Sequence, residues 1–434
     1  MEVMLESQPR DGDSASFWNN PVAWFREKNL GRQYWTFFAV AFFFDAGFSI
    51  YVFLFNLYLL DVHFNERAIG LIGGAMMLGS LAGLLPAGAL ARKFGIKPLL
   101  FFCLTAAPLL SATRAVWIWE PAQIGLGFIT GVAMCGWGVC FLPAVARLTT
   151  EKNRTSAFTL IFSASLATAA IGGVICGYLQ QWVGRAGLTM QPAEVKRVIL
   201  LASCATAALG LIPALRLRLP AILEDEIAPE FQELRRRWFD DWKMSPFLLR
   251  FLPLMAAWSA VLASFTPFAN IYLSRDLNIP ITQIGLIFST VQIVQFSLGL
   301  FAPFIFRAVG LVNGIVAMQI FAAATLALLA GTRNSKLAIA LYLVFAAVQW
   351  MCAPGLYNLL MNETPDKDRS TASAMTMFSS SLAGSGATAG AGILFTRFGY
   401  PPVLVAIATL AVSVAVLFRL LMRHSISPDL NVQS

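Results

Sequence analysis

The sequence predicts an all-α polytopic membrane protein whose twelve transmembrane helices form two related halves of six. Three observations predict this fold class. Hydrophobic residues make up 58% of the chain and charged residues only 12%, with a mean hydropathy of +0.69, whereas soluble domains are about half apolar and about a quarter charged. The chain repeats itself after about 215 residues, and its Lys and Arg residues gather in every second loop.

Short motifs carry the repeat, and each returns 214 or 215 residues later. The matches are Ile69–Ile72 with Ile284–Ile287, Asn56-x-Tyr58-Leu59 with Asn270-x-Tyr272-Leu273, Arg92-x-x-Gly95 with Arg307-x-x-Gly310, and Glu151-x-x-Arg154 with Asp366-x-x-Arg369. A repeat of half of a hydrophobic chain is typical of transporters made of two related halves.

Apolar stretches of about 20 residues predict membrane-spanning helices, because a rise of about 1.5 Å per residue then crosses a hydrocarbon core about 30 Å thick. Backbone donors in lipid must bond within their own segment, which requires helices. The first six predicted spans are 34–61, 68–90, 98–116, 121–148, 155–183 and 195–215. The second six are 247–273, 281–306, 311–331, 337–361, 370–395 and 403–422.

Polar segments set the predicted domain boundaries. These are a cytoplasmic N-terminal segment 1–33, a first half 34–216, a cytoplasmic linker 217–246, a second half 247–423 and a cytoplasmic tail 424–434. Positively charged residues favour the cytoplasmic side, so the loop charges predict both termini inside the cell, in a plasma membrane protein. Tryptophans beside charged residues in the linker and at 17–29 predict amphipathic helices on the membrane surface.

Several classes of partner and chemistry are disfavoured by the sequence. The net charge of +8 follows the loops of a multispanning protein, so it does not indicate a nucleic-acid partner. The six cysteines lie in apolar segments without metal-type spacing and are expected to pack. No phosphate-binding loop, metal cluster or Ser/His/Asp set is evident in the sequence. We therefore expect no enzymatic activity, metal or other cofactor, and a monomer that takes a small-molecule substrate.

Twelve helices in two halves joined by a polar loop resemble the major facilitator superfamily, over nearly the whole chain after residue 33. The loop after the second span is similar to the family's Gly-x-Leu-Ala-Asp-Arg-x-Gly-Arg-Lys motif. The matching residues are Gly88, Leu90, Ala91, Lys93, Gly95 and Lys97. Arg92 stands at the family's Asp, and Ile96 stands at the first Arg of the closing pair. The resemblance implies the family's fold and transport by alternating access.

The resemblance also implies a gate at the cytoplasmic side, because the family's loop aspartate helps to lock that side. Arg92 has the opposite charge, and the second half repeats this difference at Arg307. The implied latch sets Arg92, Glu151 and Arg154 against Arg307, Asp366 and Arg369. The alternative is that these basic residues only enforce topology.

Asp45 is the one acidic residue well inside a predicted span, where a charge costs about 3 kcal/mol or more. Helical periodicity places Asp45, Ser49 and Asn56 on one face of the first span. A corresponding stripe in the seventh span consists of Ser259, Thr266 and Asn270. In the family these two spans flank the central cavity, so the resemblance implies that the stripes face each other there.

Three roles are open for Asp45. It can bind and release a proton, because burial favours the neutral form of a carboxyl group. It can instead stay ionised and pair with a cationic substrate, or be a structural residue satisfied by hydroxyl groups. Further candidates for contact with the substrate are Gln292, Gln295, Gln349, Trp350 and Trp137, since amides and aromatic rings hold polar ligands. For each of these the alternative is helix packing.

The sequence therefore predicts a secondary active transporter that moves a small solute by alternating access, with proton coupling through Asp45 as the leading hypothesis. One alternative is a proton-independent facilitator or exporter of a hydrophobic compound, which the 35 phenylalanines would suit. Another is a membrane receptor or scaffold that uses the same fold without transport.

Overall fold

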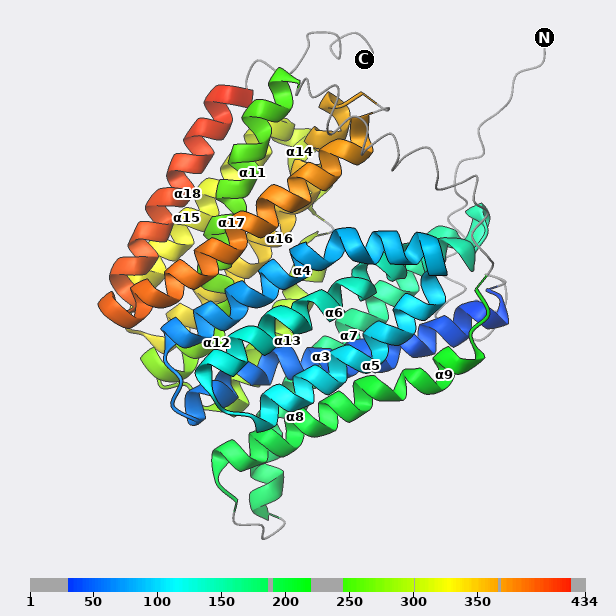
Figure 1. The fold of residues 1–434 in the computed structure, drawn as a ribbon. Helices are drawn as coiled ribbons and strands as arrows, with labels where there is room; N and C mark the ends of the chain where they lie inside the picture. The colour runs from blue at the N-terminus through cyan, green and yellow to red at the C-terminus, as the bar shows by residue number, and fades with distance from the viewer. Residues whose placement is uncertain (1–29, 186–189, 220–244, 300, 366–367, 423–434) are drawn as a thin grey trace, which may run out of the picture.

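The predicted all-α fold is confirmed. A computed structural model describes residues 30–185, 190–219, 245–299, 301–365 and 368–422, and almost all of them are helical (Figure 1). Eleven helical segments are long and apolar enough to cross a membrane. The predicted eleventh span falls outside this set because Ser, Thr, Gly and Ala make up most of its 30-residue helix. Together with that helix, Arg369–Phe398, the eleven segments agree with the twelve predicted membrane spans.

The helices follow the predicted spans closely. The first half contains α3 (Arg32–Asp61), α4 (Glu66–Phe94), α5 (Ile96–Val116), α6 (Glu120–Arg147), α7 (Glu151–Arg185), α8 (Pro192–Leu209) and α9 (Leu211–Arg216). The second half contains α11 (Pro246–Phe265), η2 (Thr266–Phe268), α12 (Ala269–Ile271), η3 (Tyr272–Asp276), α13 (Ile281–Gly299), α14 (Ala302–Val309), α15 (Leu311–Gly331), α16 (Ser335–Glu363), α17 (Arg369–Phe398) and α18 (Tyr400–Met422). The amphipathic helices predicted at 17–29 and in the linker lie outside the described residues.

The predicted seventh span is not one continuous α-helix. Its α-helix α11 ends at Phe265 and gives way to a 3₁₀ turn, one α-helical turn and a π-helical turn. Pro267 explains the change, because proline has no N–H to donate to the carbonyl of Ala263 four residues earlier. The hydroxyl of Thr388 on α17 donates to that carbonyl instead, at 3.0 Å. The predicted sixth and eighth spans are likewise each divided into two helices.

The repeated Arg-x-x-Gly motifs end helices in the same way in both halves. Gly95 follows α4 with φ +88°, and Gly310 follows α14 with φ +83°. Residues with a Cβ atom rarely adopt this left-handed region. The glycines therefore let the chain reverse at once into the next helix, as the motifs predict.

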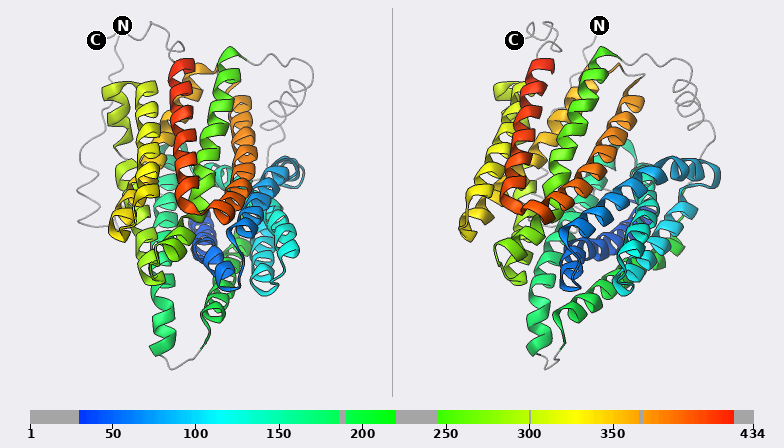
Figure 2. Two further views of the ribbon diagram at one scale, coloured as in Figure 1. Left: turned by 90° about the vertical axis from the view of Figure 1, so that its left-hand side faces the viewer. Right: turned by 60° about the vertical axis from the view of Figure 1, so that its left-hand side comes forward.

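The two halves meet through glycines that the repeat also preserves. Helix α4 packs against α17, and α7 packs against α13 (Figures 1 and 2). A Cβ atom on Gly70 would lie 3.0 Å from the Cα of Gly392, and one on Gly285 would lie 3.0 Å from the Cα of Gly177. The first contact becomes the second when 215 is added to Gly70 and subtracted from Gly392. Glycine at these positions allows backbones to approach closely.

Hydrogen bonds beside these glycines follow the same symmetry. Ser385 on α17 donates to the carbonyl of Gly74 on α4 at 2.7 Å, and Ser289 on α13 donates to the carbonyl of Ala170 on α7 at 2.5 Å. Gly74 and Ser289 are equivalent positions, as are Ala170 and Ser385. The hydroxyl donor therefore stands at one position of the equivalent pair in the first contact and at the other position in the second. Both contacts keep a hydrogen bond between the halves.

Two asparagines join the broken seventh span to the first helix. The side-chain Nδ2 of Asn56 on α3 donates to the carbonyl of Pro267 at 2.9 Å, and Nδ2 of Asn270 on α12 donates to the carbonyl of Phe53 at 3.1 Å. A shift of 214 exchanges these two bonds. We call Asn56 and Asn270 the asparagine pair.

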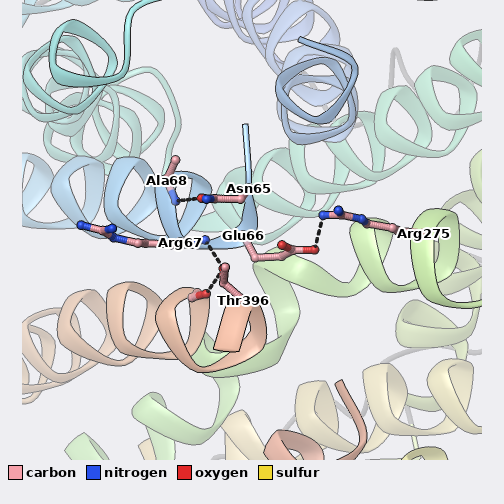
Figure 3. Close-up of polar contacts among 7 residues, drawn as sticks. Asn65, Glu66, Arg67, Ala68, Arg275 and Thr396 are labelled. Atoms are coloured by element: carbon pink, nitrogen blue, oxygen red, sulfur yellow. Dashed lines mark hydrogen bonds and ion pairs between the residues drawn. The ribbon is translucent and has the colours of Figure 1, made fainter. Parts of the chain in front are cut away.

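An ion pair and a backbone hydrogen bond also join the halves (Figure 3). Glu66 at the start of α4 accepts from Arg275 of η3, with Oε1 and Nη1 2.9 Å apart. The Glu66 side chain is 8% exposed and that of Arg275 60%. The next residue, Arg67, donates its backbone N–H to the hydroxyl of Thr396 on α17 at 2.9 Å.

These contacts define a closed end of the bundle, where Asp61 and Glu66 lie. The halves diverge toward the opposite end, the terminal end, where α3 begins and α18 ends (Figures 1 and 2). Three residues of the predicted latch can be placed there, and each makes contacts within its own half. Arg154 donates to the carbonyl of Ala146, Arg369 to those of Met361 and Thr364, and Arg307 lies over the Phe304 ring. The side chains of Arg92 and Glu151, and residue Asp366, lie outside the described part of the chain.

We expect Asn56→Ala and Asn270→Ala to weaken the closed end. One such hydrogen bond contributes about 1 kcal/mol net, so each variant should shift the equilibrium toward opening of the closed end about fivefold, and the double variant roughly thirtyfold. Spin labels at Phe94 and Val309, exposed at the terminal end, should then report shorter distances. Asn313→Ala, an exposed amide on α15, is the control. Unchanged distances in the double variant would contradict a role for the pair.

Charge exchange tests the ion pair separately. Glu66→Arg or Arg275→Glu alone places like charges together and should destabilise this conformation by about 1–2 kcal/mol. The double exchange should recover most of that loss, as a double-mutant cycle of melting temperatures would measure. Arg397→Glu reverses an exposed charge at the same end and is the control. Strict additivity of the two single effects would show that the pair contributes nothing.

Candidate functional site

A cavity of about 710 Å³ lies between the two halves, within the size range of small-molecule sites. Helices α3 and α7 form its wall in the first half, and α13, α16 and the broken seventh span form its wall in the second. Its lining comprises Asp45, Phe48, Ser49, Val52, Phe53, Asn56, Ser165, Ala169, Gly173, Thr266, Pro267, Asn270, Phe288, Val291, Gln292, Gln295, Tyr342, Ala346 and Gln349.

The wall in the first half carries the only ionisable acid among these lining residues. Asp45 projects from the middle of α3, and its carboxylate accepts a hydrogen bond from the hydroxyl of Ser165 on α7. One turn further along α3, Ser49 donates to its own helix at the carbonyl of Ala46, 3.0 Å away. The carboxylate therefore has one hydroxyl partner while it still lines the cavity.

The wall in the second half carries amides. Gln292 and Gln295 lie on one face of α13, and Tyr342, Ala346 and Gln349 follow one another along one face of α16. The amide of Gln295 donates to the carbonyl of Ala346 at 3.0 Å. This bond ties α13 to α16 and brings the two amide-bearing faces side by side.

The asparagine pair and the break after Phe265 border the cavity where the two halves meet. Thr266 and Pro267 lie in the 3₁₀ turn, and the Thr266 hydroxyl is 3.4 Å from Oε1 of Gln349. The break thus exposes polar groups to the cavity at the level of the asparagine pair.

Aromatic rings form the apolar part of the wall. The rings of Phe53 and Phe288 cross from one half to the other with centroids 5.2 Å apart, and those of Phe288 and Tyr342 are 5.9 Å apart. Edge-to-face and tilted rings at these distances pack favourably. They form an apolar aromatic part of the cavity wall beside the amides.

The structure brings most of the predicted binding residues together. Those that line the cavity are Asp45, Ser49, Asn56, Thr266, Asn270, Gln292, Gln295 and Gln349. Their predicted roles in binding or coupling stay predictions, because lining a cavity does not establish contact with a substrate.

Three predicted residues lie elsewhere. Ser259 is outside the lining, because the α-helical register that would align it with Thr266 ends at Phe265. Trp350 is 57% exposed; it follows Gln349 directly, so the two side chains point about 100° apart around the helix. Trp137 packs inside the first half, against Phe44 with ring centroids 4.5 Å apart.

Sequence reasoning missed several lining residues. Nothing local in the sequence indicates that Ser165 meets Asp45, 120 residues earlier. Tyr342, Phe48 and Phe288 lie in strongly apolar helices, where an aromatic residue facing a cavity looks the same as one facing lipid. Their spacing from polar residues on the same face, such as Tyr342 seven residues before Gln349, was the one available signal.

Comparison with known proteins gives a family match and several similar folds. The family model described as Major Facilitator Superfamily matches residues 37–388. The crystal structure of the nucleoside transporter NupG is 17% identical, with TM-score 0.70, and the match covers 91% of this chain and 100% of that one. A bacterial homologue of the human lysosomal transporter Spinster, inward-facing and unoccupied, is 13% identical with TM-score 0.70, covering 92% and 100%.

A third similar structure is the inward-open xylose transporter XylE from E. coli. It is 13% identical with TM-score 0.66, and the match covers 88% of this chain and 94% of that one. A search of curated protein sequences gives no match. At these identities, the likeness to solved structures concerns the fold.

Proposed function

Since the chain belongs to the major facilitator superfamily and is a membrane transporter rather than an enzyme, we propose that it is a secondary transporter of a small solute, coupled to protons through Asp45. The observation that carries the proposal is the position of Asp45. Its carboxylate lines a cavity between the two halves and has a hydroxyl partner from a second helix. A carboxyl group there can exchange a proton with whichever side the cavity faces.

The geometry of the two ends supports alternating access. The contacts at the closed end are backbone approaches, single hydrogen bonds and one partly exposed ion pair, which can separate as a unit when the halves rock. The latch predicted at the terminal end would close that side in the opposite state. We place the terminal end in the cytoplasm of a plasma membrane protein, since Lys and Arg gather on that side. The described conformation is then inward-facing.

The polar lining favours this proposal over the two alternatives. A carrier of purely hydrophobic compounds has no use for a carboxylate and several amides facing its cavity, since each unpaired polar group disfavours apolar cargo. A scaffold or receptor without transport has no need of a cavity that opens between mobile halves. The functional unit proposed is a monomer, because the cavity is lined by one chain.

Transport by reconstituted protein tests the role of Asp45. In liposomes supplied with labelled sugars, nucleosides, amino acids and organic cations, we expect the wild type to concentrate one class in response to an imposed pH gradient. Asp45→Asn cannot release a proton and should lose this gradient-driven accumulation, at least tenfold, while Asp45→Glu keeps part of it. Glu120→Gln, which changes an exposed carboxylate at the start of α6, is the control.

Exchange at equal pH separates coupling from substrate binding. If Asp45 only couples, Asp45→Asn should still exchange internal for external solute without a gradient. If Asp45 pairs directly with a cationic substrate, exchange should fail as well. Gradient-driven accumulation by Asp45→Asn at the wild-type rate would refute the proposal.

A further inference from the structure

The charges around the cavity narrow the class of solute. Among the lining residues Asp45 is the one charged side chain, and none is Lys, Arg or His. A phosphate or carboxylate group entering this space would leave water without gaining a counter-ion and would meet a carboxylate. Transfer of an unpaired ion from water into such a site is strongly unfavourable. The cavity therefore favours an uncharged or cationic solute over an anion.

The amides of the second half present a donor beside an acceptor. Nε2 of Gln295 donates a hydrogen bond to the carbonyl of Ala346, and Oε1 of Gln349 accepts one from the hydroxyl of Thr266. The other amide atoms, Oε1 of Gln295 and Nε2 of Gln349, have no hydrogen-bond partner among the described residues. Ala346 and Gln349 are three residues apart on one face of α16, so these two glutamines are neighbours. Together they offer an acceptor and a donor to a ligand.

Such a pair matches a ligand edge that carries a C=O next to an N–H. This edge occurs in the lactam of pyrimidine and purine rings, and both of its bonds to amides are of ordinary strength. A sugar presents hydroxyl groups that could satisfy the same atoms but has no planar face. The rings of Phe288 and Tyr342, tilted by 42° with their centroids 5.9 Å apart, add an aromatic wall against which an edge or face of a heterocycle would pack.

The opposite wall suits hydroxyl groups. The Asp45 carboxylate accepts a hydrogen bond from the hydroxyl of Ser165. Its remaining lone pairs can accept further hydrogen bonds from a solute. A carboxylate can accept hydrogen bonds from the vicinal hydroxyl groups of a ribose, and a solute that carries these groups can remain uncharged. The first half would then hold the hydroxylated part of the solute and the second half its ring.

From these observations we infer that the solute is an uncharged nucleoside-like compound, whose lactam edge contacts Gln295 and Gln349 and whose hydroxyl groups face Asp45. The inference rests on the proposed transport function, because it takes the cavity as the transport site. It adds a substrate class, and it divides recognition between the two halves that move relative to each other. Both halves would have to hold the solute for it to influence their rocking.

Binding to the purified full-length protein tests this inference without transport. We expect uridine to raise the melting temperature, since a ligand that binds only the native state stabilises it. N3-methyluridine, which has lost the ring N–H, should bind at least tenfold more weakly. Uridine 5′-monophosphate should bind at least tenfold more weakly because of its phosphate. Ribose, which lacks the ring, should also bind more weakly than uridine.

Protein variants give the matching test. Gln349→Ala and Gln295→Ala should each raise the Kd for uridine about fivefold, as expected for the loss of one hydrogen bond of ordinary strength, while Asn313→Ala leaves it unchanged. Because the methylated ligand tests the same contact on unaltered protein, a variant that misfolds does not prevent a decision. Equal affinity for uridine and N3-methyluridine, or no stabilisation by uridine at millimolar concentration, would overturn the inference.

The two proposals fail in different ways. If uridine binds as described but its transport is indifferent to the pH gradient and to Asp45→Asn, the substrate class stands and proton coupling falls. If a cationic amine or an amino acid binds in place of uridine and its accumulation requires Asp45, proton coupling stands and the nucleoside-like class falls.

Discussion

The structure depends on a close approach of two backbones at the closed end. Gly70 meets Gly392 and Gly285 meets Gly177 with no room for a Cβ atom between them. Helices in lipid gain no hydrophobic free energy from meeting each other, so they associate through tight packing and hydrogen bonds. The glycines permit the packing, and Ser385 and Ser289 supply hydrogen bonds between the same pairs of helices. The cavity occupies the space beside these contacts, where the halves move apart.

The break after Phe265 shows how one residue changes both the fold and the cavity. Pro267 removes a backbone donor, and an unpaired carbonyl within a membrane costs free energy. Thr388 bonds the carbonyl of Ala263 that the proline leaves, and Asn56 bonds the carbonyl of Pro267 itself. The irregular backbone is therefore held by helices from both halves. The irregular turn also places the hydroxyl of Thr266 beside the side-chain amide of Gln349. This contact joins the break to the amides of the cavity.

The repeat is kept at several contacts between the halves and differs at the carboxylate and the glutamine amides of the cavity. The contact residues Gly70 and Asn56 have identical counterparts in the second half, Gly285 and Asn270. Four candidate binding residues have different counterparts: Asp45 corresponds to Ser259, and Gln292, Gln295 and Gln349 correspond to Met77, Ser80 and Met134. An interface between pseudo-symmetric halves has to be complementary to its own copy. A site for an asymmetric solute gains from different chemistry on its two walls, so the cavity follows no such rule.

Local patterns in the sequence are sufficient to predict the number and order of the helices, the repeat and the position of Asp45 within a span. These follow from local hydropathy, from the length needed to cross a bilayer, and from the free energy of a charge in lipid. The polar stripe on α3 was predictable because that helix is regular. The stripe on the seventh span was predictable only in part. The α-helical register that would align Ser259 with Thr266 and Asn270 ends before Pro267.

Which polar residues share one cavity depends on how the helices pack and does not follow from local patterns. Ser165 reaches Asp45, and Gln295 reaches Ala346, across distances in sequence that no local pattern relates. The packing of the helices also places Trp137 inside the first half and leaves Trp350 exposed outside the cavity lining. Apolar, aromatic and small residues occur against lipid, against another helix and at cavity walls alike. Hydropathy therefore does not separate these surroundings, and only the packing of the helices assigns each residue to one of them.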